Sequence, residues 1–357
     1  MERLVVRGGR RLSGTVRVAG NKNAAGPALA AALLTDERVC IRNVPEIGDV
    51  QVFVELLRRI GMQIEAEGDH AWTASAARVS SGRVDPQLGR QVRMSLLLAG
   101  PLLARLGRAE LPPPGGDVIG RRRIDTHLLA LQALGAKVEA ERDGYRLSAT
   151  RLRGADLLLD EMSVTATENA LLAAVCAEGH TVIHNAASEP HVQDLCNLLS
   201  VMGASITGVG TNRLVVDGVD RLRGADYTIG PDYLEVGSFI GLAAATRSTL
   251  RITSCRPAEH GMTRIMFNRL GVDWNVAGED IVVPADQALE VTEDDGHAMA
   301  KIDDAPWPGF PADLISIATV VATQARGAVL IHEKLYESRL YFVDRLISMG
   351  ARVVLCD

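Results

Sequence analysis

The stretch Ala133–Glu141, which reads ALGAKVEAE, decides the fold because it returns twice more along the chain. It reappears as VMGASITG at Val201–Gly208 and as SMGARVVLC at Ser348–Cys356. In each copy a helical run ends at a glycine, and a short strand follows. An internal repeat of this kind defines the architecture before any single motif does.

The same helix-ending glycine can be followed through the whole chain. Its copies lie 74, 68, 68 and 79 residues apart and are Gly61, Gly135, Gly203, Gly271 and Gly350. This period is too long for a solenoid of helix pairs and fits a βαβα unit with extra strands. We therefore expect an α/β (α+β) fold of three-unit domains, with Ala- and Leu-rich helices inside and sheets outside.

The repeat also predicts where individual elements lie. We expect helices at Ala24–Leu34, Val50–Ile60 and Leu128–Leu134, and a hairpin over Met1–Gly20, where apolar residues alternate. Further buried helices should begin at Ser95, Thr167, near Glu235 and at Asp313.

Composition excludes several classes of function. The 357 residues carry a net charge of -6 and only 4% aromatic residues, so we expect no nucleic-acid partner. The five cysteines form no CxxC pair, and no carboxylate completes a metal pattern around His180 and His184, so we expect no metal. The N-terminus has no signal-peptide core, and Ala24–Leu34 is too short to cross a bilayer. We expect a soluble cytoplasmic protein with no membrane partner.

One loop breaks the repeat. Pro112–Gly116 holds three prolines and two glycines, and Asp117 and the arginines Arg121–Arg123 follow it closely. Such a segment can be neither a helix nor a central strand. A solvated charged turn is one interpretation. A movable lid that binds a phosphorylated substrate is the other, because guanidinium groups bind phosphate in a bidentate manner.

Other candidate site residues lie at predicted helix starts. Lys22 and Asn23 precede the first buried helix and form either an anion site or a surface lysine beside an N-cap. Arg93 precedes the apolar run that begins at Met94. Asp313 follows APWPGFPA and is either a helix N-cap, a held functional acid, or both. We find no Walker loop, no GxGxxG and no GxSxG elbow, and we expect no cofactor.

Together the motifs resemble those of the UDP-N-acetylglucosamine enolpyruvyl transferases, members of the EPSP synthase superfamily. The matching segments are GNKNAAGPALAAALL (20–34), PPGGDVIGRRRIDTH (113–127), SVTATENALLAA (163–174), NAASEPHVQDL (185–195) and FPADL (310–314). The resemblance implies a two-domain inside-out α/β barrel of βαβαββ units. Residues 1–20 plus 232–357 would form one domain, and 21–231, with the catalytic loop near 112–123, the other. Five of the six expected units are present, so the first domain is expected to be incomplete.

The resemblance also implies an activity: transfer of the enolpyruvyl group of phosphoenolpyruvate to the 3′-hydroxyl of UDP-N-acetylglucosamine, with release of phosphate. This step opens peptidoglycan synthesis and so serves cell-wall biogenesis, cell shape and division. The complete protein is expected to be a monomer. A truncated form that binds the UDP-sugar without chemistry is an alternative. A 3-phosphoshikimate 1-carboxyvinyltransferase is another, against which the turn SVTATEN argues.

Site roles follow from the resemblance, position by position. Catalysis would involve Asp117, Asp313 and Lys22, and phosphoenolpyruvate would be bound by Lys22, Asn23 and Arg122. UDP-N-acetylglucosamine would be bound by Asn23, Arg93, Arg122, Arg123, Ile124, Asp125, Thr126, Ser163, Val164, Asp313, Leu335 and Arg339.

Two positions depart from the usual pattern of these enzymes. Asp117 stands where most members carry the cysteine that fosfomycin alkylates, so resistance to fosfomycin is expected, since a carboxylate is the weaker nucleophile. Tyr233 stands where an arginine is usual, which removes one positive charge from this position.

Overall fold

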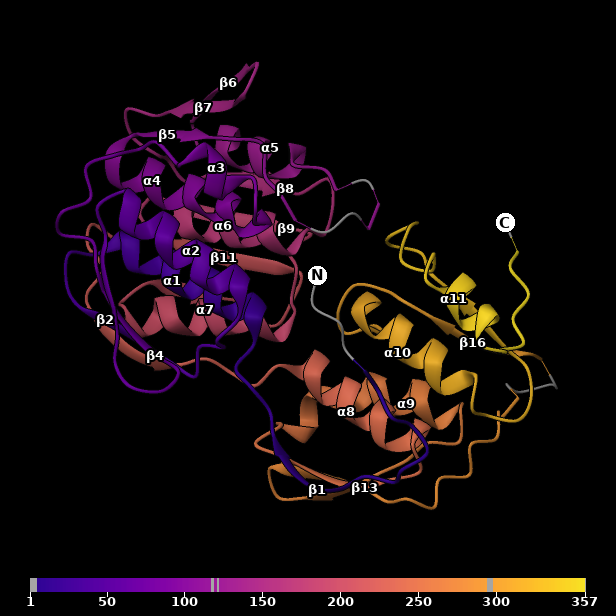
Figure 1. Ribbon diagram of the computed structural model, residues 1–357. Helices are drawn as coiled ribbons and strands as arrows, with labels where there is room; N and C mark the ends of the chain where they lie inside the picture. Colours follow the sequence, from indigo (N-terminus) through magenta and orange to yellow (C-terminus); the bar gives the residue numbers. More distant parts are fainter. Residues whose placement is uncertain (1–4, 117–118, 121, 294–297, 357) are drawn as a thin grey trace. The chain divides into compact units, whose positions relative to one another are not determined.

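The computed structural model describes residues 5–116, 119–120, 122–293 and 298–356, and it divides into two compact units (Figure 1). Unit 1 comprises Met1–Val18, Val118–Arg121 and Pro231–Asp357, and unit 2 comprises Ala19–Asp117 and Arg122–Gly230. Each unit has its own apolar core.

Unit 2 holds most of the helices. They are α1 (Lys22–Ala31), η1 (Ala32–Leu34), α2 (Gly48–Arg59), α3 (Pro86–Gly89), η2 (Arg93–Leu98), α4 (Ala99–Leu106), α5 (Asp125–Ala133), α6 (Val164–Ala174) and α7 (Pro190–Val201). Its strands are β2 (Val39–Arg42), β3 (Gln63–Ala66), β4 (Ala71–Ser75), β5 (Arg108–Leu111), β6 (Lys137–Glu141), β7 (Gly144–Ser148), β8 (Asp156–Leu158), β9 (His180–His184), β10 (Ser205–Thr207), β11 (Arg213–Asp217) and β12 (Ala225–Thr228).

Three sheets surround the helices of unit 2, in the strand orders β12-β2-β4-β3, β5-β7-β6 and β10-β11-β9-β8. Nearly every residue of α1 and α6 is buried, whereas strands such as β6 and β10 are largely exposed. Ala and Leu fill these helices because small side chains let helices approach closely. The expectation of helices inside and sheets outside is confirmed for this unit (Figure 1).

Unit 1 is built in the same way. Its elements are β1 (Ser13–Arg17), α8 (Tyr233–Ala245), β13 (Thr249–Thr253), η3 (Pro257–His260), α9 (Gly261–Asn268), β14 (Asn275–Ala277), β15 (Asp280–Val283), β16 (Ala300–Asp303), α10 (Ala312–Ala322), β17 (Val329–His332) and α11 (Val343–Ser348). Helices α8 and α10 pack together beside a four-stranded sheet, β1-β13-β15-β14, and a two-stranded sheet, β16-β17.

The repeated glycines have one structural task. Gly61, Gly135, Gly203, Gly271 and Gly350 follow α2, α5, α7, α9 and α11, and each has a positive φ between 71° and 106°. A glycine in this conformation ends a helix without the steric cost that other residues incur. A strand follows the first four of these glycines, so the helix–glycine–strand corner is confirmed in four copies. The strand predicted after Gly350 is wrong, because the described residues 351–356 form neither a helix nor a strand.

The hairpin expected over Met1–Gly20 is wrong. Among the described residues of this segment there is one strand, β1, and it pairs in parallel with β13, from Ser13 opposite Thr249 to Arg17 opposite Thr253. Alternating side chains fit any half-buried strand, so the pattern did not identify the partner. Helices are found in the predicted segments, but α2 begins two residues early and α5 and α6 begin three residues early. The helix expected to begin at Ser95 is wrong at its start, because Ser95 lies in the 3-10 helix η2 and α4 begins at Ala99.

Candidate active site

Predicted site residues gather at helix starts in unit 2. Lys22 begins α1, Arg93 begins η2, Asp125 begins α5 and Val164 begins α6. The first N–H groups of a helix have no partner within it, and the helix dipole is positive at that end. These positions therefore suit anionic groups such as phosphates.

The start of α1 is capped by a buried asparagine. The Asn21 side chain is 1% exposed and accepts a hydrogen bond from the Asn23 backbone N–H at 2.8 Å. The Lys22 ammonium lies 2.6 Å from the Asp49 carboxylate, and both side chains are about half exposed, at 40% and 47%. Because exposed ion pairs are weak, Lys22 can exchange Asp49 for an incoming anion at little cost.

A second group of polar contacts surrounds Arg123. The Arg93 guanidinium donates to the Arg123 carbonyl at 2.7 Å. Arg123 in turn binds Asp125 at 2.9 Å and Asp160 at 2.8 Å, and the Thr126 hydroxyl donates to Asp160 at 2.7 Å. The Thr126 hydroxyl and Arg123 hold the pKa of Asp160 below its usual range, so this carboxylate stays ionised. Asp160 thus joins the start of α5 to the segment before α6.

Beneath this group lies a buried imidazole. Asn169 donates to His127 Nδ1 at 3.0 Å, so His127 Nε2 carries the proton and donates to the Thr165 hydroxyl at 3.0 Å. Asn169 also binds the Leu96 carbonyl at 2.7 Å and the Gly100 N–H at 2.8 Å. Burial, helped by Arg93, lowers the pKa of His127 to about 3, so the ring is neutral. The ring links α5 to α6, and Asn169 links α6 to η2 and α4.

The turn before α6 has a conventional cap. Ser163 is the N-cap residue, and its hydroxyl accepts from the Ala166 N–H at 3.4 Å. Val164 follows as the first helical residue, and Ile124 occupies the equivalent capping position before α5. Since Asp160 lies only three residues before Ser163, the Arg123 contacts also fix the approach to this turn.

The Pro112–Gly116 loop runs beside two of the arginines. It is neither helix nor strand, as expected. A Cβ built on Gly116 would lie 3.1 Å from Arg93 Cβ and 3.4 Å from Arg122 Nη1, so the glycine permits a close approach. Arg122 is half-buried. Asp117, predicted to be catalytic, lies outside the described residues.

In unit 1 the predicted residues form a compact group. Asp313 lies in the first turn of α10 and forms an ion pair with Arg339. The guanidinium of Arg339 lies 5.4 Å from the centre of the Tyr336 ring, a cation–π arrangement. The N-cap interpretation of Asp313 is wrong, because Pro311 is the N-cap of α10 and no side chain caps this end. Asp313 is instead oriented by Arg339.

Leu335 belongs to the segment that follows β17. Its backbone N–H donates to Asp304 at 3.2 Å, and the Lys334 N–H donates to the other oxygen of Asp304 at 2.6 Å. Sequence reasoning missed Asp304 and also missed Asp49 and Asp160. None of these acids stands in a recognisable motif, and each is separated by many residues from its partner.

Tyr233, which stands where an arginine is usual, is buried at the start of α8. Its ring meets Trp307 edge to face with 5.6 Å between centroids. An aromatic pair of this kind stabilises packing, so at this position apolar contact takes the place of charge.

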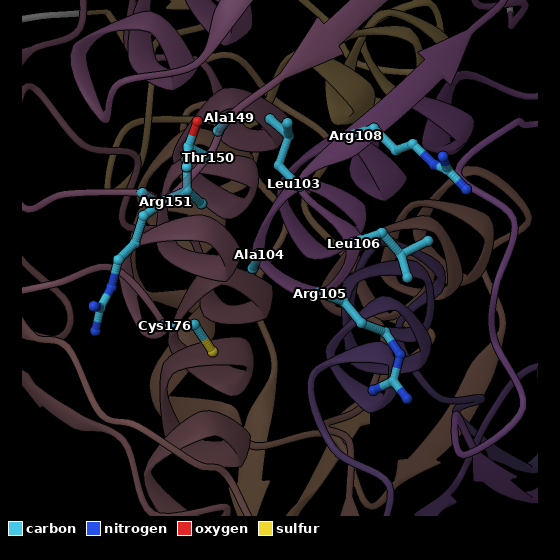
Figure 2. Close-up of a pocket in the computed structure, with 11 residues that line it drawn as sticks. Leu103, Ala104, Arg105, Leu106, Arg108, Ala149, Thr150, Arg151 and Cys176 are labelled. Atoms are coloured by element: carbon cyan, nitrogen blue, oxygen red, sulfur yellow. The ribbon is translucent and has the colours of Figure 1, made fainter.

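One cavity of unit 2 contains none of the predicted site residues. It measures about 460 Å³ and is lined by residues from α4, from the segment after β7 and from the turn after α6, including Leu103, Thr150 and Cys176 (Figure 2). Arg105 at its edge is bound to Asp36 and to the carbonyl oxygens of Leu33 and Ala76. Burial raises the pKa of the Cys176 thiol to about 11, which makes it unreactive.

Neither a metal cluster nor a membrane span is found in the described parts of the chain. His180 binds Asp217 at 2.7 Å and His184 binds Asp156 at 2.9 Å. The two histidines noted in the sequence therefore each have a carboxylate partner on a neighbouring strand.

These features define an α/β protein of repeated units, with several of the predicted site residues at helix N-termini. Comparison with known proteins identifies the class. The family model described as EPSP synthase (3-phosphoshikimate 1-carboxyvinyltransferase) matches residues 6–356. The enolpyruvyl transferase NikO from Streptomyces tendae has a similar structure, with a TM-score of 0.85 and 26% identity over 98% of this chain and 81% of its own.

Two relatives are more similar in sequence, and both are called UDP-N-acetylglucosamine 1-carboxyvinyltransferase. The protein from Treponema denticola is 52% identical over 100% of this chain and 84% of its own length. The protein from Bradyrhizobium diazoefficiens is 54% identical over 99% of this chain and 82% of its own length. The chain belongs to the EPSP synthase family of enolpyruvyl transferases.

Proposed function

We propose that this protein transfers the enolpyruvyl group of phosphoenolpyruvate to the 3′-hydroxyl of UDP-N-acetylglucosamine and releases phosphate. The observation that carries this proposal is the identity of 52% and 54%, over essentially the whole chain, to two UDP-N-acetylglucosamine 1-carboxyvinyltransferases. The polar groups described above are consistent with it, since both substrates are anionic.

In this proposal the start of α1 binds phosphoenolpyruvate. Lys22 would leave its exposed pair with Asp49 and bind the phosphate. Asn23 is fixed by the buried Asn21 cap, and Arg122 lies beside Gly116 on the same unit. A cation, an amide and a guanidinium together supply the donors that a phosphate monoester needs.

Residues of each unit are assigned to the nucleotide sugar. Arg93, Arg123, Ile124, Asp125 and Thr126 surround one linked set of hydrogen bonds. Ser163 and Val164 form the neighbouring turn, where the uridine would bind. From unit 1, Leu335, Arg339 and Asp313 would meet the nucleotide and the sugar.

The chemistry requires three proton transfers. An acid protonates the methylene carbon of phosphoenolpyruvate, and the neighbouring carbon becomes cationic. The 3′-hydroxyl attacks that carbon while Asp313 accepts the hydroxyl proton, and Arg339 holds the Asp313 carboxylate in position. Loss of a methyl proton and of phosphate from the tetrahedral adduct then restores the double bond. We assign the first proton transfer to Asp117, whose side chain would need a raised pKa to act as an acid at neutral pH.

Phosphate release tests the proposal directly. Phosphate should appear only when phosphoenolpyruvate and UDP-N-acetylglucosamine are both present. Binding of the UDP-sugar without phosphate release would instead support the non-catalytic alternative. Release with shikimate 3-phosphate as the acceptor, but not with the UDP-sugar, would overturn the assignment of substrate.

Two consequences extend the proposal to the cell. The reaction would take place in the cytoplasm, where both substrates are made, and would supply cell-wall synthesis, and through it cell shape and division. Fosfomycin should leave the unmodified protein active because Asp117 is a poor nucleophile toward the epoxide. The Asp117→Cys variant should be alkylated and inactivated, which mass spectrometry of the intact chain would detect. A covalent adduct on the unmodified protein at a comparable rate would contradict this.

A further inference from the structure

We propose that Asp304 and Glu333 form a proton-sharing positioning pair that shapes the acceptor-binding segment Glu333–Arg339. This inference rests on the proposed function, because Leu335 and Arg339 of that segment are assigned to the nucleotide sugar. Asp304 and Glu333 would position the segment without touching the substrate themselves. Their shared proton would make the affinity for the acceptor depend on pH.

The topology of unit 1 brings the two acids together. Strands β16 and β17 are parallel, and their register ends with Asp303 opposite His332. Asp304 and Glu333 are the next residues of the two strands, so both emerge from the same edge of the sheet. The acids are far apart in sequence, yet the register places them side by side.

Asp304 binds the segment through its backbone. The Asp304 side chain is 0% exposed, and its two oxygens accept from the successive N–H groups of Lys334 at 2.6 Å and Leu335 at 3.2 Å. Both oxygens of this buried side chain therefore have a hydrogen-bond donor. Asp304 therefore sets the position of the Leu335 backbone.

In the described part of the chain, only one of the two carboxyl oxygens of Glu333 has a hydrogen-bond donor. One oxygen, Oε1, accepts from the Tyr336 N–H at 3.0 Å and closes the turn. The other oxygen, Oε2, is buried and has no hydrogen-bond donor among the residues that the structure describes. Burial, together with the neighbouring Asp304 carboxylate, raises the pKa of Glu333 to about 8. A proton on Glu333 gives it a donor toward Asp304, so one proton serves both acids.

The surrounding charges are already paired. Asp303 binds Lys301 at 2.9 Å and Lys334 at 2.6 Å. Arg339 lowers the pKa of Glu333 from a distance, but its guanidinium is bound to Asp313. Glu337, on the same segment, also has a partner. These cations therefore offset only part of a second negative charge on the pair.

The predicted consequence is a loss of acceptor affinity in alkaline solution. When pH rises through about 8, the shared proton leaves and two adjacent carboxylates repel each other. The Leu335 backbone and Arg339 then lose the arrangement that the acceptor needs. If only the protonated form binds tightly, affinity at pH 9 should be about tenfold lower than at pH 7.

The test uses the Glu333→Gln variant of the full chain. Glutamine keeps the shape and a permanent donor toward Asp304 but does not titrate. Affinity for UDP-N-acetylglucosamine would be measured by calorimetry from pH 6.5 to 9, and kcat and KM by phosphate release. The unmodified protein should lose affinity above pH 8, with a rise in acceptor KM larger than the change in kcat, while Glu333→Gln should show no such loss. Glu290→Gln, an exposed acid paired with Arg326, is the matched control and should follow the unmodified protein.

Amide hydrogen exchange at Lys334–Tyr336 separates this inference from the proposed function. Exchange in the unmodified protein should exceed that in Glu333→Gln at pH 9 and match it at pH 7, whether or not any acceptor binds. Identical exchange and binding profiles in the two proteins would overturn the positioning pair. Absence of UDP-sugar binding at pH 7 would overturn the proposed function alone, and the exchange result would still decide the pair. If the Glu333→Ala variant folds, its backbone amides at Lys334–Tyr336 should exchange faster than those of the unmodified protein at every pH. If that variant does not fold, the comparison with Glu333→Gln decides the question.

Discussion

The central helices of the two units have similar sequences and different surroundings. In unit 2, nine of the eleven residues of α6 are buried, whereas in unit 1 only five of the eleven residues of α10 are. Both helices are rich in Ala, Val and Leu or Ile. The described part of unit 1 surrounds its helices with two sheets and unit 2 with three. The comparison teaches that the repeat determines the helix, while the number of packed neighbours determines how far that helix is buried.

Apolar exposure in unit 1 follows from this difference. Val320 on α10 is 37% exposed, Leu330 on β17 is 46% exposed and Met349 after α11 is 82% exposed. Each such side chain forgoes the burial that stabilises its counterpart in unit 2. Unit 1 nevertheless carries Asp313 and Arg339, so the less covered unit holds the residues assigned to the central proton transfer.

The largest expected effect tests whether the chemistry belongs to unit 1. Asp313→Asn should lower turnover by roughly 100- to 10,000-fold, the usual contribution of a positioned acid or base. Nucleotide binding should persist, because the unit 2 contacts are unchanged. Steady-state phosphate release and calorimetry with the UDP-sugar would measure the two effects.

A matched substitution controls for charge. Asp273→Asn removes an acid of the same unit whose side chain is 62% exposed and pairs with Arg264. It should leave turnover within about twofold of the unmodified protein, since exposed ion pairs contribute little. Near-normal turnover in Asp313→Asn would remove Asp313 from the mechanism and leave unit 1 with a binding role only.

The next effect concerns stability. Limited proteolysis should cut first within 231–357 and leave a resistant core from unit 2, because less covered segments open at lower free energy. Hydrogen exchange followed by peptide mapping should show higher protection in α6 than in α10. Equal protection of the two helices would show that solvent exposure of α10 does not weaken unit 1.

The sequence predicted the repeated architecture because helix-ending glycines and buried Ala-rich helices are local signals. It also located Lys22, Arg93 and Asp313 at helix starts, where apolar runs begin abruptly. The partner of β1 could not be predicted, because strand pairing depends on contacts distant in sequence. For the same reason Asp160 and Asp304 were missed. Their importance lies in the groups that the fold places beside them, Arg123 and the Leu335 backbone.

Acidification should affect the units unequally. Burial lowers the pKa of His127 and His191 in unit 2 to about 3, and lowers that of His260 in unit 1 to about 4. An unfolded histidine titrates near 6.5, so the unfolded chain binds the extra proton and stability falls as pH drops below that value. Among the described residues, Glu168 in unit 2 and Glu333 in unit 1 are carboxyls with a raised pKa, and each makes its unit more stable as pH falls. Because unit 2 has two such histidines and unit 1 has one, unit 2 should lose stability more steeply than unit 1 between about pH 6 and 4.5, by on the order of 1 kcal/mol per pH unit.

Hydrogen exchange in each unit at pH 6.5 and pH 5, corrected for intrinsic rates, measures this difference. His191→Phe, a buried ring that cannot be protonated, should remove the excess loss in unit 2 if the variant retains its fold. A parallel decline of both units in the unmodified protein would show that burial of the histidines does not set the acid sensitivity.

The smallest expected effect concerns how unit 2 positions the acceptor. Thr126 is 1% exposed, and its hydroxyl donates to Asp160, which also binds Arg123. Thr126→Val keeps the side-chain shape and removes that donor, so Asp160 and Arg123 should become less well fixed. A hydrogen bond to a charged group contributes about 1.5–3 kcal/mol when fully buried, but Arg123 and Asp160 are partly exposed, which reduces the effect. We expect the KM for UDP-N-acetylglucosamine to rise roughly three- to tenfold with kcat unchanged, because the contact orders the binding surface and not the reacting groups.

Thr228→Val, on an exposed position of β12, is the matched control and should leave both constants unaltered. A fall in kcat with unchanged KM would instead show that the start of α5 takes part in the chemical step. The assignment of acceptor binding to unit 2 and of the proton transfer to unit 1 would then be wrong.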